Sequence, residues 1–299
     1  MAIKIIFRTH KGGTGKTTFT FNAANYLTSQ GYKVLCVDTD PQGSLTNVLA
    51  NSWLKKINNN TSTWENLNSV KLEGTSTNDL FDGIEDFSQV KILKATHDID
   101  LIYMIPNDFH AGFAMQDHNR CGKFIDSMKL IIENTDYDFV FFDLPPTVTP
   151  YVVASLSYVD YYVIPQTVAA NIKAAKGEID IISKLGKSDH LLGVVLNQID
   201  RGSREHYNAE INLRDLLKDV LFNASIHHST TIDTSLARNI PLSKVAGARK
   251  SYLEMREMIE EMLERIYIKQ AIALSNGTFA GTEKEKQRLI AHIKKQGVK

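Results

Sequence analysis

Six short apolar segments recur along the chain, and stretches with a helical pattern separate most of them. Each segment is continuously apolar instead of alternating, as is typical of parallel strands that are covered on both faces. The alternation of strands and helices predicts an α/β fold, a doubly wound and mostly parallel sheet with helices on both faces. The predicted strands are residues 3–7, 33–38, 98–106, 137–143, 159–165 and 191–200, and the predicted helices are residues 17–31, 119–133, 168–185, 208–221 and 248–267.

The composition fits one large globular domain with an appended tail. Of the 299 residues, 43% are hydrophobic, which suffices for a sizeable core and excludes wholesale disorder. The 34 basic and 34 acidic residues cancel, which excludes a globally basic, histone-like protein. We expect residues 1–267 to form the domain. Within it, residues 57–80 are expected to be a surface insertion, since 13 of these 24 residues are Asn, Ser or Thr.

Charge is distributed unevenly between this domain and the tail. Residues 268–299 hold seven Lys or Arg and two acidic residues, a balance of +5 that leaves −5 on the rest of the chain. We expect this tail to be helical. It is either an ordinary solvated helix or a basic arm for nucleic acid or another acidic surface.

The chain shows no sign of export or of membrane insertion. Its two cysteines, Cys36 and Cys121, cannot form a disulfide framework. The apolar run at the N-terminus is too short for a signal peptide, and no stretch approaches the roughly 18 apolar residues of a membrane span. We therefore expect a cytoplasmic protein.

A glycine-rich loop, His-Lys-Gly-Gly-Thr-Gly-Lys-Thr-Thr at residues 10–18, separates the first predicted strand from the first predicted helix. Its glycines let successive backbone N–H groups face a phosphate, and the helix N-terminus adds its dipole. In such loops the lysine at the position of Lys16 reaches the β- and γ-phosphates, and the hydroxyl at Thr17 binds Mg²⁺. His10 stands where the usual pattern has its first glycine, and a second lysine, Lys11, follows it. The predicted nucleotide-binding residues of the loop are Lys11, Gly12, Gly13, Thr14, Gly15, Lys16, Thr17 and Thr18.

Three aspartates, Asp38, Asp40 and Asp143, follow predicted strands. Ligands of open α/β sheets bind at the carboxyl ends of the strands, so these side chains are expected to converge on the loop. Carboxylates beside phosphates repel them unless Mg²⁺ lies between. We predict that Asp143 holds the metal with Thr17, directly or through a water, and that Asp38 is structural and pairs with a loop N–H.

The loop resembles the deviant Walker A motif of the ParA/MinD family of P-loop ATPases. Residues 37–43, Val-Asp-Thr-Asp-Pro-Gln-Gly, resemble the second motif of the family, and residues 141–146, Phe-Phe-Asp-Leu-Pro-Pro, resemble its Walker B strand end. Weaker similarities at residues 79–83 and 101–106 occur in the right order. The resemblance covers about residues 3–267, and its first three motifs together are very specific.

This resemblance implies ATP and Mg²⁺ as cofactors, hydrolysis of ATP to ADP and phosphate, and an ATP-dependent homodimer. It implies that Lys11 crosses the dimer interface to the phosphates of the partner, a charge supplied in trans as by an arginine finger. It also implies that Asp40 orients the attacking water, with a water-mediated metal contact as a further role. Lys11, Lys16 and Asp40 are therefore the predicted catalytic residues.

The end of the last predicted strand, residues 197–200 with the sequence Asn-Gln-Ile-Asp, resembles a base-reading motif. The amide of Asn197 could hydrogen-bond adenine, because it offers both a donor and an acceptor. The resemblance favours adenine, whereas Asp200 raises guanine as the alternative. Arg201 and Arg204 follow at the place where ParA proteins contact the DNA backbone, so they are the predicted DNA-binding residues.

Three classes of function fit these features. The leading one is a DNA-partitioning ATPase of a plasmid or chromosome, found on the nucleoid. In that class the dimer binds DNA without sequence specificity, and a ParB-like centromere-binding protein stimulates hydrolysis and release. The second is a MinD-like membrane-cycling positioning ATPase, but residues 283–299 offer it Leu289, Ile290 and Ile293 and no aromatic residue, so we expect no membrane binding. The third is a metabolic P-loop enzyme or metallochaperone, for which the sequence shows no substrate pocket or Cys/His ligands.

Overall fold

The structure is a computed structural model that describes residues 2–57, 74–105, 109–168, 172–279, 281–283, 286–287 and 289–290. Its strands are β1 (Ile3–Phe7), β2 (Val34–Asp38), β3 (Leu93–Lys94), β4 (Asp100–Ile102), β5 (Phe139–Asp143), β6 (Tyr161–Thr167), β7 (Leu191–Ile199) and β8 (Leu221–His227). They form one eight-stranded sheet in the order β3-β4-β2-β5-β1-β6-β7-β8. The pairing is parallel throughout, except that β3 runs antiparallel to β4. The predicted fold class is therefore confirmed.

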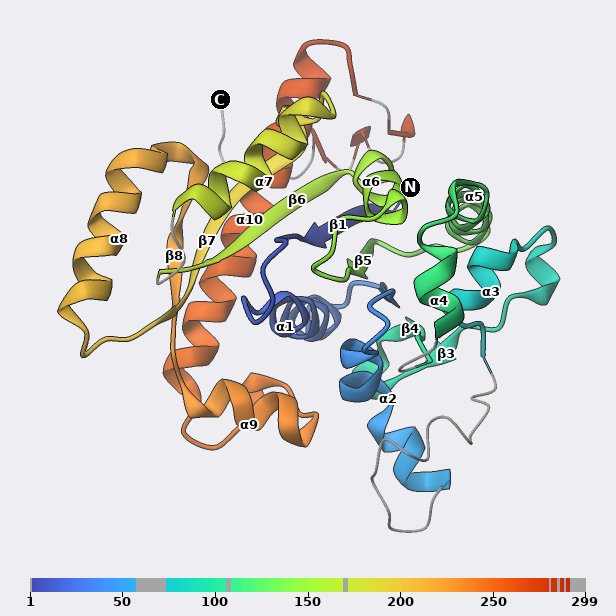
Figure 1. The fold of residues 1–299 in the computed structure, drawn as a ribbon, viewed down its shortest axis with the longest axis horizontal. Coiled ribbons are helices and arrows are strands. Elements are labelled where there is room, and N and C mark those ends of the chain that lie inside the picture. Colours follow the sequence, from blue (N-terminus) through green and yellow to red (C-terminus); the bar gives the residue numbers. More distant parts are fainter. Residues whose placement is uncertain are drawn as a thin grey trace.

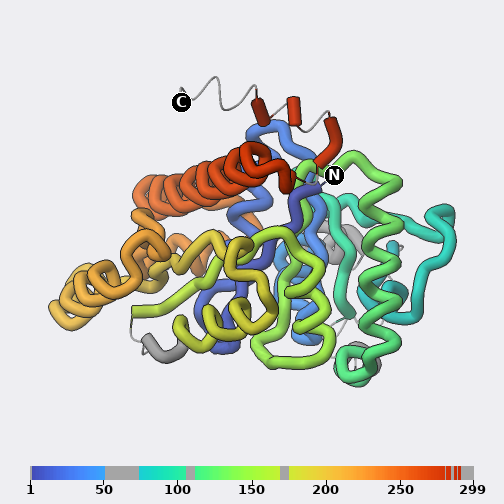
Figure 2. Tube along the Cα trace, turned by 90° about the horizontal axis from the view of Figure 1, so that it is seen from above, coloured from blue at the N-terminus to red at the C-terminus, as the bar shows by residue number. Residues whose placement is uncertain are grey.

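Helices cover both faces of the sheet (Figures 1 and 2). One hydrophobic cluster joins the sheet to α1, α2, α9 and α10, and a second joins its other face to α3, α5, α6, α7 and α8. The helices are α1 (Lys16–Ser29), α2 (Ser44–Ile57), α3 (Thr77–Asp82), α4 (Phe109–Ala114), α5 (His118–Glu133), α6 (Pro150–Tyr158), α7 (Ile172–Lys184), α8 (Arg204–Leu217), α9 (Thr230–Arg238) and α10 (Arg249–Ser275).

The strand order brings the predicted site residues to one edge of the sheet. β1 lies between β5 and β6, so the loop that follows Phe7 is flanked by the ends of both neighbours. Asp38 and Asp143 are register partners at the ends of β2 and β5. Thr167 and Asn197 are partners at the ends of β6 and β7. Parallel register thus gathers residues from distant parts of the sequence around the loop.

All six predicted strands are present, although β4 covers only Asp100–Ile102 of the predicted 98–106. The sequence revealed neither of the two edge strands, β3 and β8. An edge strand exposes N–H groups that have no neighbouring strand to accept them. In β8, carboxylates of α10 accept them: Glu254 Oε2 from the N–H of His227, and Glu261 Oε1 from the N–H of Asn223, both at 3.0 Å. The stabilising partners of β8 therefore come from a helix that follows it in the sequence.

Helix boundaries differ from the predictions where capping or packing decides them. The predicted helix 208–221 begins earlier, at Arg204, because the Ser203 hydroxyl caps it by accepting a hydrogen bond from the N–H of His206. It ends at Leu217, since β8 begins at Leu221. The last predicted helix extends past residue 267 to Ser275.

Parts of the insertion and of the tail lie outside the described residues. These are residues 58–73 of the insertion, and residues 280, 284–285, 288 and 291–299 of the tail. Leu289 is described, and it is only 4% exposed. The boundary between domain and tail at residue 267 stays a prediction.

Candidate nucleotide-binding site

The glycine-rich loop links the end of β1 to the start of α1, as the sequence predicts (Figure 1). Two of its glycines have left-handed backbones, with φ of 72° at Gly13 and 98° at Gly15. Gly15 is also the N-cap of α1, and no side chain caps this helix. The first N–H groups of α1 therefore lack a side-chain acceptor, an arrangement that favours an anion.

Lys16 and two carboxylates lie at the base of this loop. The Lys16 side chain belongs to α1 and is buried, with 8% of the residue exposed. Burial lowers the pKa of Lys16, while the negative charges of Asp143 and Asp40 raise it. A buried ammonium group between carboxylates suits the binding of phosphate together with a metal cation.

Thr17 and Asp143 form the strongest candidate for a metal site. The Thr17 hydroxyl donates to Asp143 Oδ2 at 2.6 Å, while the buried Oδ1 of Asp143 has no hydrogen-bond partner among the described residues. Burial raises the pKa of Asp143 to about 7, although the hydrogen bond from Thr17 acts against this shift. Oxygen ligands are those that Mg²⁺ prefers, so this pair fits that ion.

The protein can supply only part of the coordination shell of such an ion. No group of three or more His, Cys, Asp or Glu suited to a metal occurs in the part of the chain that the structure describes. Mg²⁺ commonly binds through one or two protein ligands and takes its other ligands from phosphates and water. The pair Thr17 and Asp143 matches this mode of binding.

The two aspartates after β2 have different surroundings. Asp38 is fully buried, and its carboxylate accepts hydrogen bonds from the N–H groups of Asp40 at 3.1 Å and Thr46 at 2.7 Å. Neither donor belongs to residues 10–18, so the N–H partners of Asp38 come from the segment after β2 and not from the glycine-rich loop; its structural role stays a prediction. Asp40 is half-buried, and its Oδ1 accepts a hydrogen bond from the N–H of Gln42 at 3.0 Å. Its Oδ2 has no hydrogen bond to a described residue, so it is available to a water molecule.

Lys11 differs from Lys16 in its exposure. Its side chain points to solvent, and no ion pair joins its ammonium group to a described residue. Its backbone is held on both sides, because its N–H donates to Thr9 Oγ1 at 3.3 Å and its carbonyl accepts from the Thr14 hydroxyl at 3.4 Å. The charge of Lys11 is thus available to a group outside this chain.

Two amides at the end of β7 hold the loop from the other side. Asn197 Nδ2 donates to the carbonyl of Thr14 at 2.8 Å, and Gln198 Nε2 donates to the carbonyl of Gly13 at 2.9 Å. Asn197 is 5% exposed. These contacts show that Asn197 supports the loop, and base recognition by Asn197 stays a prediction.

The two predicted DNA-binding arginines differ in the partners of their guanidinium groups. Arg201 forms an ion pair with Glu254 of α10, and the Nδ1 atom of His227 lies 3.2 Å from the same carboxylate oxygen. Arg204 is exposed in the first turn of α8 and makes no ion pair with a described residue. Of these two arginines, Arg204 alone is therefore without an ion pair to a described residue.

Three residues for which no role was predicted hold the loop or the residue before it: Gln198, Arg8 and Glu178. Glu178, in α7, accepts a hydrogen bond from the N–H of His10, and Arg8 directly precedes the loop. For Arg8 a signal existed, since a charged residue that directly follows an apolar strand needs a partner if it is buried. No comparable signal marks Gln198 or Glu178.

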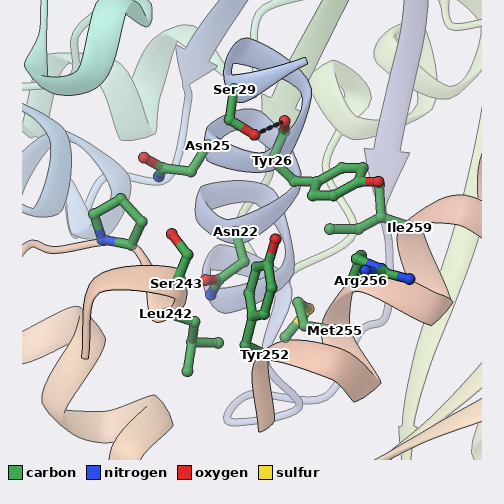
Figure 3. A pocket seen from close by; sticks show the side chains of 11 residues that line it. Asn22, Asn25, Tyr26, Ser29, Leu242, Ser243, Tyr252, Met255, Arg256 and Ile259 are labelled. Atoms are coloured by element: carbon green, nitrogen blue, oxygen red, sulfur yellow. Dashed lines mark hydrogen bonds between the residues drawn. The ribbon is translucent and has the colours of Figure 1, made fainter. Parts of the chain in front are cut away.

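A separate groove lies between α1 and α10 (Figure 3). Its walls combine polar and apolar side chains and include Asn22 and Asn25 of α1 and Tyr252 and Arg256 of α10. None of residues 10–18 lines it. It is therefore distinct from the phosphate-binding loop.

Comparisons with known proteins agree with this geometry. Residues 2–191 match the AAA_31 family, described as an AAA domain. The chromosome-partitioning ATPase Soj of Thermus thermophilus is 25% identical over 276 residues, covering 88% of this chain and 96% of Soj. A complex of a Cyanothece McdA variant with ATP aligns with a TM-score of 0.68 at 20% identity, covering 88% of this chain and 96% of McdA. The septum site-determining protein MinD of Pyrococcus horikoshii, in complex with Mg-ADP, aligns with a TM-score of 0.65 at 21% identity, covering 90% of this chain and 99% of MinD.

Proposed function

Because this chain belongs to the AAA_31 family of AAA domains and is homologous to Soj/ParA/MinD-type ATPases, we propose that it is a DNA-partitioning ATPase. The observation that carries the proposal is the cluster of Lys16, Thr17 and Asp143 at the glycine-rich loop. A buried ammonium group, a hydroxyl and a carboxylate oxygen without a partner converge there. This set suits a nucleotide triphosphate bound with Mg²⁺.

Each residue has a distinct role in the proposed reaction. Lys16 and the loop N–H groups bind the β- and γ-phosphates, and Thr17 and Asp143 hold Mg²⁺, which neutralises phosphate charge when bound. Asp40 orients the attacking water through its available Oδ2 atom. Lys11 reaches the phosphates of a second copy, so that ATP favours a sandwich dimer. The exposed position of Lys11 supports this role.

In the proposed cycle the dimer binds DNA without sequence specificity. The monomer has a net charge of zero, so a single copy should hold DNA weakly. A dimer presents Arg204 and the basic tail twice, which should both strengthen binding and steepen its dependence on salt. A ParB-like protein bound to the cargo then stimulates hydrolysis and release.

A MinD-like function is the second candidate, because MinD is also similar in structure. Membrane attachment of that kind would need an exposed apolar face in the tail. Leu289, one of the apolar residues of segment 283–299, is only 4% exposed and so does not add to such a face, which favours the DNA-binding function. No helix among the described residues combines the length and the apolarity needed to span a bilayer.

The deciding experiment compares binding to unrelated DNA duplexes and to anionic liposomes, each with ATP, ADP or no nucleotide. We expect ATP-dependent binding to all duplexes alike and none to liposomes. Lys16→Ala is the control, because it should lose the nucleotide response without changing the exposed surface. Equal DNA binding in all three nucleotide states, or sedimentation with liposomes alone, would contradict the proposal.

A further inference from the structure

A buried ion pair lies next to the phosphate-binding loop. Arg8 follows β1 and Glu178 belongs to α7, and each side chain is 1% exposed. Arg8 Nε is 3.7 Å from Glu178 Oε2, and neither atom has a hydrogen-bond partner among the described residues. Charged side chains are almost never buried this completely unless they are paired. The pair therefore needs an explanation beyond the general packing of the core.

Glu178 is tied to the first residue of the loop. Its Oε1 atom accepts a hydrogen bond from the N–H of His10 and lies 2.7 Å from Nδ1 of the His10 ring. The backbone of α7 lies close to this ring, because a Cβ added at Gly177 would be 3.9 Å from the Cε1 atom of His10. The His10 side chain is 44% exposed, so the buried carboxylate of Glu178 contacts a residue that lies at the surface of the loop.

Arg8 links the pair to the segment that follows Asp143. Its Nη1 atom donates to the carbonyl oxygens of Thr9 at 2.9 Å, Pro145 at 3.3 Å and Pro146 at 3.4 Å. The pair thus connects the loop, the segment after the proposed metal ligand and α7. A change in the position of α7 would be transmitted to both of the other segments.

The two halves of the loop are held by different contacts. Asn197 holds the second half through Thr14, and Thr17 is held by Asp143. At the start of the first half, the contacts of His10 with Glu178 are the ones that reach outside the loop and the strand before it. The backbone of Lys11 has two longer contacts, one of 3.3 Å with the Thr9 hydroxyl and one of 3.4 Å with the Thr14 hydroxyl. Loss of the Glu178 carboxylate should therefore disturb the first half and leave the second in place.

We propose that Glu178 is a positioning residue that holds His10, and through it Lys11, in the orientation that Lys11 needs to reach a second copy. This inference rests on the proposed function, in which Lys11 acts during turnover. Glu178 has no hydrogen bond or ion pair with residues 11–18 among the described contacts. It acts through its contacts with the backbone N–H and the ring of His10, which directly precedes Lys11.

The direct test is hydrogen–deuterium exchange of the loop amides in His10→Ala and Glu178→Gln. We expect faster exchange at residues 10–12 and unchanged exchange at residues 15–18. Asp180→Asn, which neutralises an exposed carboxylate on the same helix, is the matched control and should change neither. His10→Ala removes the contact between the ring and Oε1 but keeps the backbone N–H as a donor, so Glu178→Gln should have the larger effect. Unchanged exchange at residues 10–12 in Glu178→Gln, or in His10→Ala if Glu178→Gln does not fold, would overturn the inference.

Kinetics give the second test. His10→Ala should lower kcat and weaken ATP-dependent dimerisation by about ten- to a hundredfold, the equivalent of one hydrogen bond to a charged group. ADP affinity should stay within about twofold, because the second half of the loop is intact. His10→Asn, which keeps a donor near the position of Nδ1, should recover most of the loss. The double variant of His10→Ala and Glu178→Gln should be no worse than Glu178→Gln alone.

The outcomes separate this inference from the proposed function. A wild-type protein without ATPase activity would refute the proposed function, and the exchange data would then decide the role of Glu178 alone. An active wild type whose turnover is unaffected by His10→Ala and Glu178→Gln would refute the positioning role. Parallel losses of kcat, ADP affinity and thermal stability would show that Glu178 is only structural.

Discussion

Alanine substitutions at three loop glycines should have three different costs. Gly15→Ala combines two penalties. A non-glycine residue in the left-handed region, with φ of 98° here, costs about 1–2 kcal/mol. The new Cβ would also lie 2.4 Å from Asn197 Nδ2, which must then move away from the carbonyl of Thr14. Loss of that hydrogen bond adds about 1 kcal/mol, so the total is about 2–3 kcal/mol.

The other two glycines serve as internal controls. Gly13→Ala should cost only the backbone strain, about 1–2 kcal/mol, because φ is 72° but no atom lies within 4 Å of the added Cβ. Gly12→Ala meets nothing within 4 Å, and its φ lies outside the left-handed region, so its free energy of unfolding should stay within about 0.5 kcal/mol of wild type.

The measurement is the free energy of unfolding in urea without nucleotide, for the three variants and for Gly15→Ala combined with Asn197→Ala. If the contact with Asn197 is responsible, removing that side chain should reduce the cost of Gly15→Ala to the level of Gly13→Ala. Equal costs for Gly13→Ala and Gly15→Ala in the presence of Asn197 would refute the predicted contact between the loop and β7.

Three further predictions concern the proposed cycle. Asp40→Ala should bind ATP but not hydrolyse it, since the loop remains intact, and the dimer should accumulate; normal phosphate release would disprove the role. Lys11→Ala should bind ADP normally and fail to dimerise with ATP, as light scattering can show; a surviving ATP-dependent dimer would make Lys11 an ordinary exposed lysine. Glu254→Gln should release Arg201, strengthen DNA binding and steepen the salt slope by about 0.9, the value for one phosphate contact. Glu257→Gln, an exposed neighbour on α10, controls for net charge, and equal effects of the two would refute the release of Arg201.

The parts of the fold that the sequence predicted are those encoded by local pattern. Residues 3–7 and 33–38 are continuously apolar and became central strands with buried side chains. β8 was missed because Asn223 and Ser225 interrupt its apolar pattern and because its N–H groups are accepted by residues of α10. A strand that depends on a helix later in the chain cannot be identified from its own residues.

The same distinction separates the predicted from the missed residues of the site. Lys16 and Thr17 could be found because the chemistry of phosphate binding fixes their spacing from the glycines. Asp143 could be found because it ends an apolar strand. Glu178 contacts His10 across 168 residues of sequence, so only the packing of α7 on the sheet brings the two together.

The two predicted DNA-binding arginines show why residue type alone does not establish a binding role. The sequence treats Arg201 and Arg204 alike, but Arg201 is engaged by Glu254, 53 residues further along the chain. Arg204 lies in the first turn of α8, where a positive charge opposes the helix dipole and costs about 0.3–1 kcal/mol. Such a charge does not stabilise its own helix. It is therefore Arg204 that is suited to an external phosphate in this conformation, whereas Arg201 can contribute only when DNA competes successfully with Glu254.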